Sequence, residues 1–406
     1  MESSYRKEIS LSISLSYLYW ISVLMIFLSS VFYYFEEYYG GDLAGVDYPV
    51  DKFKLIVFTS IYLFFLTGSL WLSKVLLRLK LSDYIVVVRS KLILYLFFIL
   101  FYLIVFFLIV FFGVGTIHRD VETNRFAELF FAFFDPYTFM IVIIYYIFYS
   151  MSDRFLEKLL FLFCFFVYFF LIVRSGFTGF LIPLIPIFIS FLLKFLSKAL
   201  VIFLLGVSVI SFPFIRIGKW IIGAGMGFFS EYNFNLDLIH IATRGVIERF
   251  SAVPNMVYVS EALVNKNEFL QSDYLPFFQG YLGSFLHKLF FINPVALNTL
   301  LLHQTIHNTD QDSNSTFPIV SYFSLEFFLG ITTFVYVFFL VFIISRLLLV
   351  IFGRAKLGNK LSLYLLFFIM FFYAFNGWFW AVWGVIQALI VFVFILFLFG
   401  KLSRVP

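Results

Sequence analysis

The chain has 406 residues, of which 63% are hydrophobic and only 13% are charged. Soluble domains carry about a quarter charged residues, so the composition excludes an ordinary soluble domain and indicates a membrane protein. The single cysteine, Cys164, lies inside an apolar run and excludes an internal disulfide. One cysteine also offers too few ligands for a metal site, so we expect a small buried hydrophobic side chain there.

Ten apolar runs predict membrane-spanning helices, because a hydrocarbon core needs about 20 apolar residues in helical form. They cover 11–35, 54–73, 92–112, 127–150, 155–173, 177–193, 199–217, 317–345, 360–375 and 378–400. Three runs are interrupted: the fourth by Asp135-Pro136, the sixth by Pro183 and Pro186, and the seventh by Pro213. Such breaks are tolerated where neighbouring helices or water satisfy the freed backbone groups.

The first apolar run follows Arg6 and Lys7, as the apolar part of a signal peptide would. It is too long for that role, and no cleavage site with small residues follows it. We therefore expect the run to be the first membrane helix, and we expect no cleavable targeting segment.

The predicted fold is all-α: a polytopic membrane protein of about ten transmembrane helices with one large outer loop. Residues 1–217 hold helices one to seven, 218–316 form the loop, and 317–406 hold helices eight to ten. Loops of roughly a hundred residues are either functional or small domains. We expect amphipathic helices within this one.

The distribution of lysine and arginine predicts the orientation, because these residues concentrate in cytoplasmic segments. With the N-terminus in the cytoplasm, the inner segments hold 17 of the 28 basic residues but only five of the 23 acidic residues. The inner face then has a net charge of +12 and the outer face −7. Both termini are thus predicted to be cytoplasmic. The overall charge of +5 indicates orientation, and we expect no nucleic-acid partner.

All five histidines and a group of arginines and lysines fall on the predicted outer face, against the positive-inside bias. Arginine is suited to bidentate contact with phosphate, so these cations can meet lipid headgroups or an anionic ligand. The residues are His118, His240, His287, His303, His307, Arg119, Arg125, Arg174, Arg216, Lys219, Arg244 and Arg249.

Arg174 ends the fifth run and is followed by Ser175-Gly176 and then Gly179. Small residues there allow close helix approach and free the backbone amides of the next helix start, where an anion can bind. Two interpretations stay open for Arg174. It is a phosphate ligand at the membrane surface, or it is an arginine whose head reaches up to the lipid headgroups.

Arg216 and Lys219 end the seventh run, and GAGMG follows at 223–227. Glycines bring backbone amides close to a diphosphate, but the lysine of a P-loop and a preceding strand are missing. A flexible linker is the better interpretation of the glycines.

The stretch NLDLIHIATRGVIERFSAV predicts an amphipathic helix lying on the membrane or on the bundle. At 100° per residue, one stripe holds Asp237, His240, Arg244 and Glu248, and the other side holds Leu238, Ala242, Val246 and Phe250. The stripe can be a solvated face with an Arg244–Glu248 pair. Arg249 lies outside this stripe, at the boundary between the polar and apolar sides, so a solvated face explains it less well.

The end of the loop holds further polar candidates. His303 and His307 are four residues apart, a spacing that suits two metal ligands, but no third-ligand pattern supports zinc. Asp310 and Asp312 form a DxD, which metal-dependent glycosyltransferases share but which a polar loop often produces. We predict no metal. Glu326 enters the eighth run, where a carboxylate is costly and so is expected to have a partner or a role.

The layout resembles the Wzy-type polymerases of O-antigen and related polysaccharides, which are polytopic inner-membrane proteins with a large periplasmic loop late in the chain. RSGFTGFLIPLI at 174–185 resembles their arginine-glycine turn into the next helix. The segment from Arg244 to Tyr258 and Glu261 resembles the arginine-bearing helix of their loop, and NSTFPIVSYFSLEFFLG at 314–330 resembles the stretch after it. His307-Asn308 is similar to a motif of O-antigen ligases, but the leucine-rich continuation and the double glycine of a ligase are missing.

The resemblance implies glycosyl transfer at the periplasmic face of a bacterial inner membrane. The growing glycan is carried on undecaprenyl diphosphate, and a hydroxyl of a second lipid-linked repeat unit attacks the anomeric carbon. Arginines are expected to stabilise the leaving diphosphate, and Arg174, Arg216, Arg244 and Arg249 are the candidates. His307, then His303, then Glu326 are the candidates to activate the hydroxyl. No cofactor is implied, and the candidate partners are membrane lipids and the chain-length regulator and flippase of the same pathway.

Three alternatives stay open beside the polymerase. An O-antigen ligase shares the donor but joins glycan to lipid A-core. A flippase or transporter for the lipid-linked unit is expected to carry charge along a central cavity, whereas most charge here falls at outer helix ends and in the loop. A structural or assembly protein would need no histidine-arginine cluster.

Overall fold

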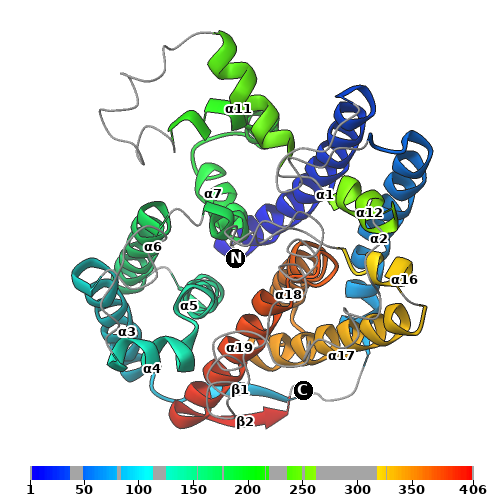
Figure 1. Ribbon diagram of the computed structural model, residues 1–406. Helices are drawn as coiled ribbons and strands as arrows, with labels where there is room; N and C mark the ends of the chain where they lie inside the picture. The colour runs from blue at the N-terminus through cyan, green and yellow to red at the C-terminus, as the bar shows by residue number, and fades with distance from the viewer. Residues whose placement is uncertain are drawn as a thin grey trace.

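The computed structural model describes residues 2–36, 49–79, 84–112, 125–152, 154–175, 178–214, 216–218, 236–248, 252–261, 318–325 and 327–404. These residues form a bundle of helices with one short sheet (Figure 1). In chain order the elements are α1 (Glu2–Glu36), α2 (Lys52–Arg78), β1 (Tyr84–Val88), α3 (Lys91–Phe112), α4 (Arg125–Phe134), α5 (Pro136–Ser150), α6 (Phe155–Ser175), η2 (Thr178–Leu184), α7 (Ile185–Leu192), α8 (Lys198–Ile210), α11 (Leu236–Glu248), α12 (Ala252–Glu261), α16 (Ser321–Leu325), α17 (Phe327–Phe352), α18 (Lys356–Phe368), η4 (Ile369–Ala374), α19 (Phe379–Phe399) and β2 (Gly400–Arg404).

All ten predicted apolar runs fold as helix, and the all-α membrane architecture holds in this coarse sense. Within the described ranges, seven helices are long and apolar enough to cross a membrane. An eighth forms if α8 and the short helix Phe212–Gly218, which meet at 56°, are one bent span. The runs broken by Asp135-Pro136 and by the two prolines give only short apolar helices. The polar and proline breaks seen in the sequence are therefore the places where the helices shorten.

The centre of the bundle is filled by α5 and α18 (Figure 1). Every residue of α5 from Pro136 to Phe148 is buried, which is the pattern of a helix that neighbours surround on all sides. It packs on α6, α19 and α3, while α18 packs on α17, α1 and α2. The lone Cys164 is buried on α6, as the sequence predicted.

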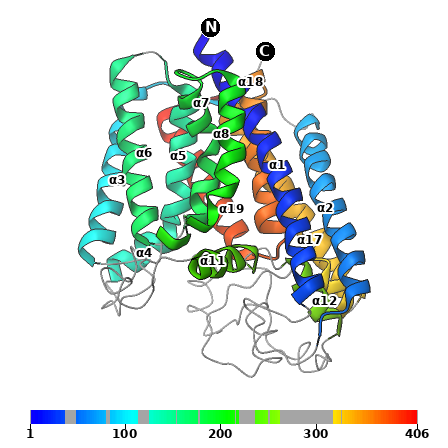
Figure 2. The ribbon, with the colours of Figure 1, turned by 90° about the horizontal axis from the view of Figure 1, so that it is seen from above.

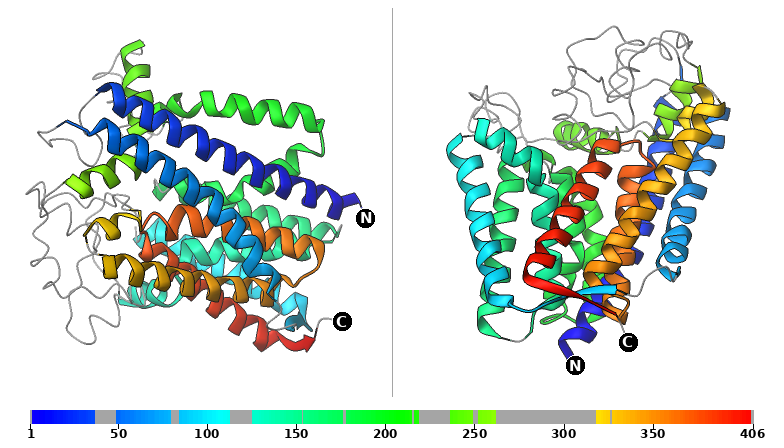
Figure 3. Two further views of the ribbon diagram at one scale, coloured as in Figure 1. Left: turned by 90° about the vertical axis from the view of Figure 1, so that its right-hand side faces the viewer. Right: turned by 90° about the horizontal axis from the view of Figure 1, so that it is seen from below.

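Both termini lie at one end of the bundle, and α11 and α12 lie at the other (Figure 2). We name these the terminal end and the distal end. At the terminal end β1 pairs antiparallel with β2, so the connection after α2 is tied to the last residues of the chain (Figure 3). The all-α prediction missed this small sheet. Its YIVVV strand has the β-branched composition that favours extended structure.

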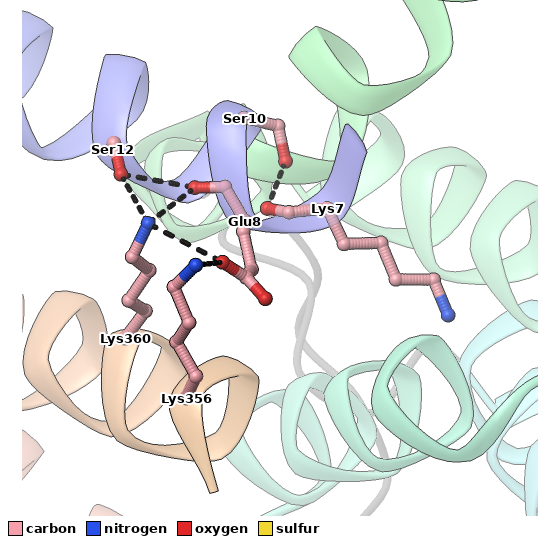
Figure 4. Close-up of polar contacts among 6 residues, drawn as sticks. All are labelled: Lys7, Glu8, Ser10, Ser12, Lys356 and Lys360. Atoms are coloured by element: carbon pink, nitrogen blue, oxygen red, sulfur yellow. Dashed lines mark hydrogen bonds and ion pairs between the residues drawn. The ribbon is translucent and has the colours of Figure 1, made fainter. Parts of the chain in front are cut away.

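A polar cluster ties α1 to α18 at the terminal end (Figure 4). Glu8 accepts from Lys356 at 2.9 Å and lies 3.7 Å from Lys360, whose ammonium also donates to Ser12. These contacts explain why α1 starts at Glu2, nine residues before the predicted start at 11. The polar extension is held by the neighbouring helix.

Arginines close the same end by capping helix carbonyls. Arg346 of α17 donates to the carbonyls of Leu76 and Leu79 at the end of α2, and Arg354 also donates to Leu79 at 2.9 Å. Lys7 donates to the carbonyl of Met151, which follows α5. Segments that the charge pattern placed together in the cytoplasm thus meet at one end of the bundle.

Tyrosine hydroxyls satisfy the backbone carbonyls that the proline break in the sixth run leaves without a donor. Pro186 has no N–H, so it cannot donate to the carbonyls of Ile182 and Pro183 one turn earlier. The hydroxyl of Tyr364 donates to Ile182 at 3.1 Å, and that of Tyr145 donates to Pro183. In an apolar bundle this satisfaction is required, because an unpaired carbonyl there has no water to accept from.

Candidate functional site

The distal end collects the predicted site residues that the structure describes. Both α5 and α6 are adjacent to Met151, which Lys7 contacts at the terminal end. The first residues of α6 lie at the terminal end, so its penultimate residue Arg174 lies at the distal end, where Figure 2 shows α11, the helix that carries Arg244. Arg216 lies at the same end, because its neighbour Ile217 packs on α11. The backbone thus brings these three arginines to one end of the bundle. The side chain of Arg174 lies outside the described residues.

The predicted amphipathic helix is confirmed as α11. Leu238 and Ala242 are buried, whereas Asp237, His240 and Arg244 are exposed, as the 100° pattern required. The helix packs on α1, so it lies on the bundle. Its Arg244 guanidinium carbon is 5.9 Å from the centre of the Phe32 ring, a cation–π contact with the distal end of α1.

Arg216 is brought next to the same helix. Its neighbour Ile217 is 2% exposed and forms a small apolar cluster with Leu238 and Ala242 of α11. Arg216 itself is half-buried. Arg216 therefore lies next to the helix that carries Arg244.

Several predicted residues lie outside the described part of the chain. These are Arg249, His303, His307, Asp310, Asp312 and Glu326. Their predicted roles stay predictions. Among the residues that the structure does describe, no three His, Cys, Asp or Glu side chains come together as a metal site would require.

The predicted outer loop contributes one helix to the core itself. Residues Ala252 to Val259 of α12 are all buried, and α12 packs on α2, α16 and α1. At its end Glu261 lies 3.5 Å from Lys54, near the start of α2. The loop at 218–316 is thus not wholly separate from the helical bundle, because this apolar helix completes the core beside α2.

A buried carboxylate marks the break between α4 and α5. Asp135 is 3% exposed and has left-handed backbone angles, φ 41° and ψ 76°. Such a conformation costs a non-glycine residue about 1–3 kcal/mol. The side chain lacks the usual cap geometry, and it interacts with the hydroxyl and the backbone amide of Thr138 in the first turn of α5.

Residues of three other elements lie close to this carboxylate. A Cβ on Gly384 of α19 would overlap it, so any larger residue there would force the carboxylate to move. One turn along α19, Gln387 donates to the carbonyl of Phe133 at 2.6 Å, close to the same break. Tyr168 of α6 and Tyr373 of η4 lie near enough to interact electrostatically with Asp135. We name Asp135, Thr138, Tyr168, Tyr373 and Gly384 the Asp135 layer.

The element that carries Tyr373 is itself irregular. η4 is a π-helix, a form that is rare and frequent at functional sites. The ring of Tyr373 stacks on Trp378 at 6.1 Å. A cavity of about 40 Å³ lies beside this layer, lined by Thr138, Tyr145 and Tyr373 among mostly apolar side chains. A volume of this size has room for a water molecule, although its lining is almost wholly apolar.

Sequence analysis noted Asp135 only as a break and did not name it as a site residue. The available signal was an acidic residue inside an apolar run, directly before a proline. An ionisable group within a membrane segment is by default a functional candidate.

The comparisons with known proteins found no relative of this chain. No protein-family model, no curated protein and no solved structure matches the chain. The residues and their arrangement therefore carry the functional argument.

Proposed function

We propose that the protein is a polysaccharide polymerase of the bacterial inner membrane. It joins lipid-diphosphate-linked oligosaccharide repeat units into O-antigen or a related surface polysaccharide. In this proposal all ten apolar segments cross or enter the membrane, both termini are cytoplasmic, and the distal end faces the periplasm. Undecaprenyl diphosphate carries the donor chain, and no cofactor takes part.

The observation that carries the proposal is the convergence of arginines at the distal end. Arg216 lies next to α11, which carries Arg244, and the backbone of Arg174 reaches the same end. Charge patterning independently favours this end as the outer one, because basic residues otherwise concentrate at the terminal end. Arginines in this position suit a diphosphate that emerges from the lipid at the headgroup level.

Each step of the transfer has a candidate residue. A hydroxyl of the acceptor unit attacks the anomeric carbon, and the bond from that carbon to the diphosphate oxygen breaks. Arg174, Arg216, Arg244 and Arg249 would stabilise the charge that develops on the leaving diphosphate. His307, His303 or Glu326 would orient or deprotonate the hydroxyl.

The test is a gel of surface glycolipid from a strain that lacks the gene. Core bearing a single repeat unit supports the polymerase, because transport and ligation still operate. Bare core with lipid-linked units accumulated in the periplasm would make the protein a ligase. A normal ladder would remove the protein from the pathway.

Orientation is tested by cysteine labelling. Cys164 is buried, so the natural chain should give little background with a membrane-impermeant maleimide. Asp237→Cys on α11 should react in intact spheroplasts, and Lys356→Cys at the terminal end only after permeabilisation. The reverse pattern would overturn the proposed orientation.

A transporter of the lipid-linked unit is the second candidate. One observation favours it: Asp135 is a buried carboxylate at a helix break, near Tyr373 of the π-helix η4. Broken helices around a buried charge are typical of transporters. In the same deletion strain a flippase would leave bare core with the lipid-linked units on the cytoplasmic side.

A further inference from the structure

The Asp135 layer is unusual among the acidic sites that the structure describes. Glu8 is paired with Lys356 and Lys360, Glu261 with Lys54, and Glu157 accepts from Ser152. Asp51 caps α2 by accepting from two backbone amides. Asp135 has Thr138 as its polar neighbour and tyrosine hydroxyls beyond, and no lysine, arginine or histidine that the structure describes pairs with it.

An ordinary capping role does not account for Asp135. A capping aspartate adopts extended backbone angles and accepts from the second or third amide of its helix. Asp135 is left-handed, and its carboxylate interacts with both the hydroxyl and the backbone amide of Thr138 without the usual cap geometry. Asparagine would tolerate the same backbone with less cost of burial, because it carries no charge. The negative charge, or the ability to take a proton, is therefore what distinguishes this residue.

Residues from three separate elements lie around the carboxylate. The chain breaks at Asp135-Pro136, η4 widens into a π-helix at Tyr373, and α19 presents glycine at 384. These positions are far apart in the sequence, so their agreement is a property of the folded site. Strain that several elements support in this way is characteristic of functional sites.

The layer lies just beneath the distal surface. Gly384 is five residues from the first residue of α19, which at 1.5 Å per residue is about 7.5 Å along the helix. It is 15 residues from Phe399, whose carbonyl accepts from Arg89 at the terminal end. The carboxylate is thus on the side of the bundle where the arginines collect.

We propose that Asp135 is the proton acceptor of the glycosyl transfer. This rests on the proposed polymerase function and adds a base that the sequence candidates did not include. The acceptor O–H bond breaks, its oxygen bonds to the anomeric carbon, and the lipid diphosphate leaves with the electron pair of the broken C–O bond. The proton passes to the Asp135 carboxylate, which releases it to the periplasm after the glycan has moved. Because Asp135 is 3% exposed, substrate entry opens the layer from its distal side.

The first test compares two aspartates at the distal end in a gene-deletion strain. Asp135→Asn keeps the shape and removes the base, and we expect polymer synthesis to fall by about 10²–10⁴-fold. Asp51→Asn keeps an equally good helix cap and should restore the ladder. Membrane-inserted Asp135→Asn that makes a normal ladder would overturn the proposal. Failure of the wild-type gene to restore any ladder would instead overturn the polymerase function.

A chemical test uses the natural chain and does not depend on a variant folding. Dicyclohexylcarbodiimide reacts with carboxylic acids in apolar surroundings, and peptide mass spectrometry locates the adduct. We expect Asp135 to be modified and polymer synthesis to be lost. Added repeat-unit substrate should slow both the modification and the loss of synthesis. Modification of Asp135 without loss of synthesis, or no modification there, would contradict the proposal.

Discussion

The two ends of the bundle are built differently. At the terminal end, charges are paired or used as caps: Glu8 bridges two lysines, and Arg346 closes the end of α2. At the distal end, helices break, an aspartate is buried without a described basic partner, and Arg244 lies on an amphipathic helix with Arg216 beside it. Under the proposed function, the terminal end serves stability and the distal end retains costly features for the glycosyl transfer.

After Asp135→Asn, the largest expected effect comes from the distal arginines. Arg244→Ala should lower polymer synthesis by about 10²–10³-fold, by analogy with the loss of one group that stabilises transition-state charge. Glycolipid gels from a complemented deletion strain measure this. Phe32→Leu is the matched control, because it removes the cation–π partner of Arg244 and keeps the charge. An equal loss in both variants would mean that Arg244 serves packing alone.

Gly384→Ala should disturb the Asp135 layer, because the added methyl overlaps the carboxylate. We expect a loss of about 1–3 kcal/mol in stability, the usual cost of overpacking, together with reduced synthesis. Thermal unfolding in detergent measures the first and the glycolipid ladder the second. In Gly206→Ala on α8 the new methyl meets nothing within 4 Å, so that variant should be neutral or slightly more stable. Equal behaviour of the two variants would contradict the close approach of α5 and α19.

Tyr364→Phe tests the repair of the proline break. Removing its hydroxyl leaves the Ile182 carbonyl without its donor, at an expected cost of about 1–3 kcal/mol. Tyr19→Phe loses a hydroxyl contact with Thr67 on an exposed surface and should change stability by about 0.5 kcal/mol or less. Unfolding of both variants in the same detergent gives the comparison. A Tyr364→Phe protein as stable as the natural chain would show that the break needs no side-chain donor.

The smallest expected effect is at the terminal end. Lys356 has a 72% exposed side chain, so its pair with Glu8 is well solvated. Glu8→Gln should therefore lower stability by no more than about 1 kcal/mol, and the loss should shrink at high salt. Synthesis should be unchanged. A strong loss of synthesis in this variant would contradict the division of roles between the two ends.

Local features of the fold followed from the sequence because they depend on nearby residues. Each apolar run became helix, and the alternation in 235–253 placed Leu238 and Ala242 inward and Arg244 outward. The break at Pro186 was visible, but its repair was not, because the hydroxyls come from Tyr145 and Tyr364 on other helices. Apolar periodicity predicts which residues are buried, but it does not predict which other elements they contact.

The features that sequence analysis missed are long-range contacts. Pairing of β1 with β2 joins residues more than 300 apart, and α12 is too short to be recognised as part of a membrane bundle. Asp135 became a site candidate only because Gly384 and Tyr373 lie near it in the fold, and no local pattern in the sequence connects these residues to it. The arginines, by contrast, were found from their exception to the positive-inside bias.

The most direct measurement of the central claim is polymerisation by the purified full chain in liposomes. Lipid-diphosphate-linked repeat units are supplied without any sugar nucleotide, and products are separated by length. We predict a ladder of lipid-linked oligomers and released lipid diphosphate, both lost in Arg244→Ala. Folded protein that leaves the units as monomers, or that only moves them across the bilayer, would contradict the account.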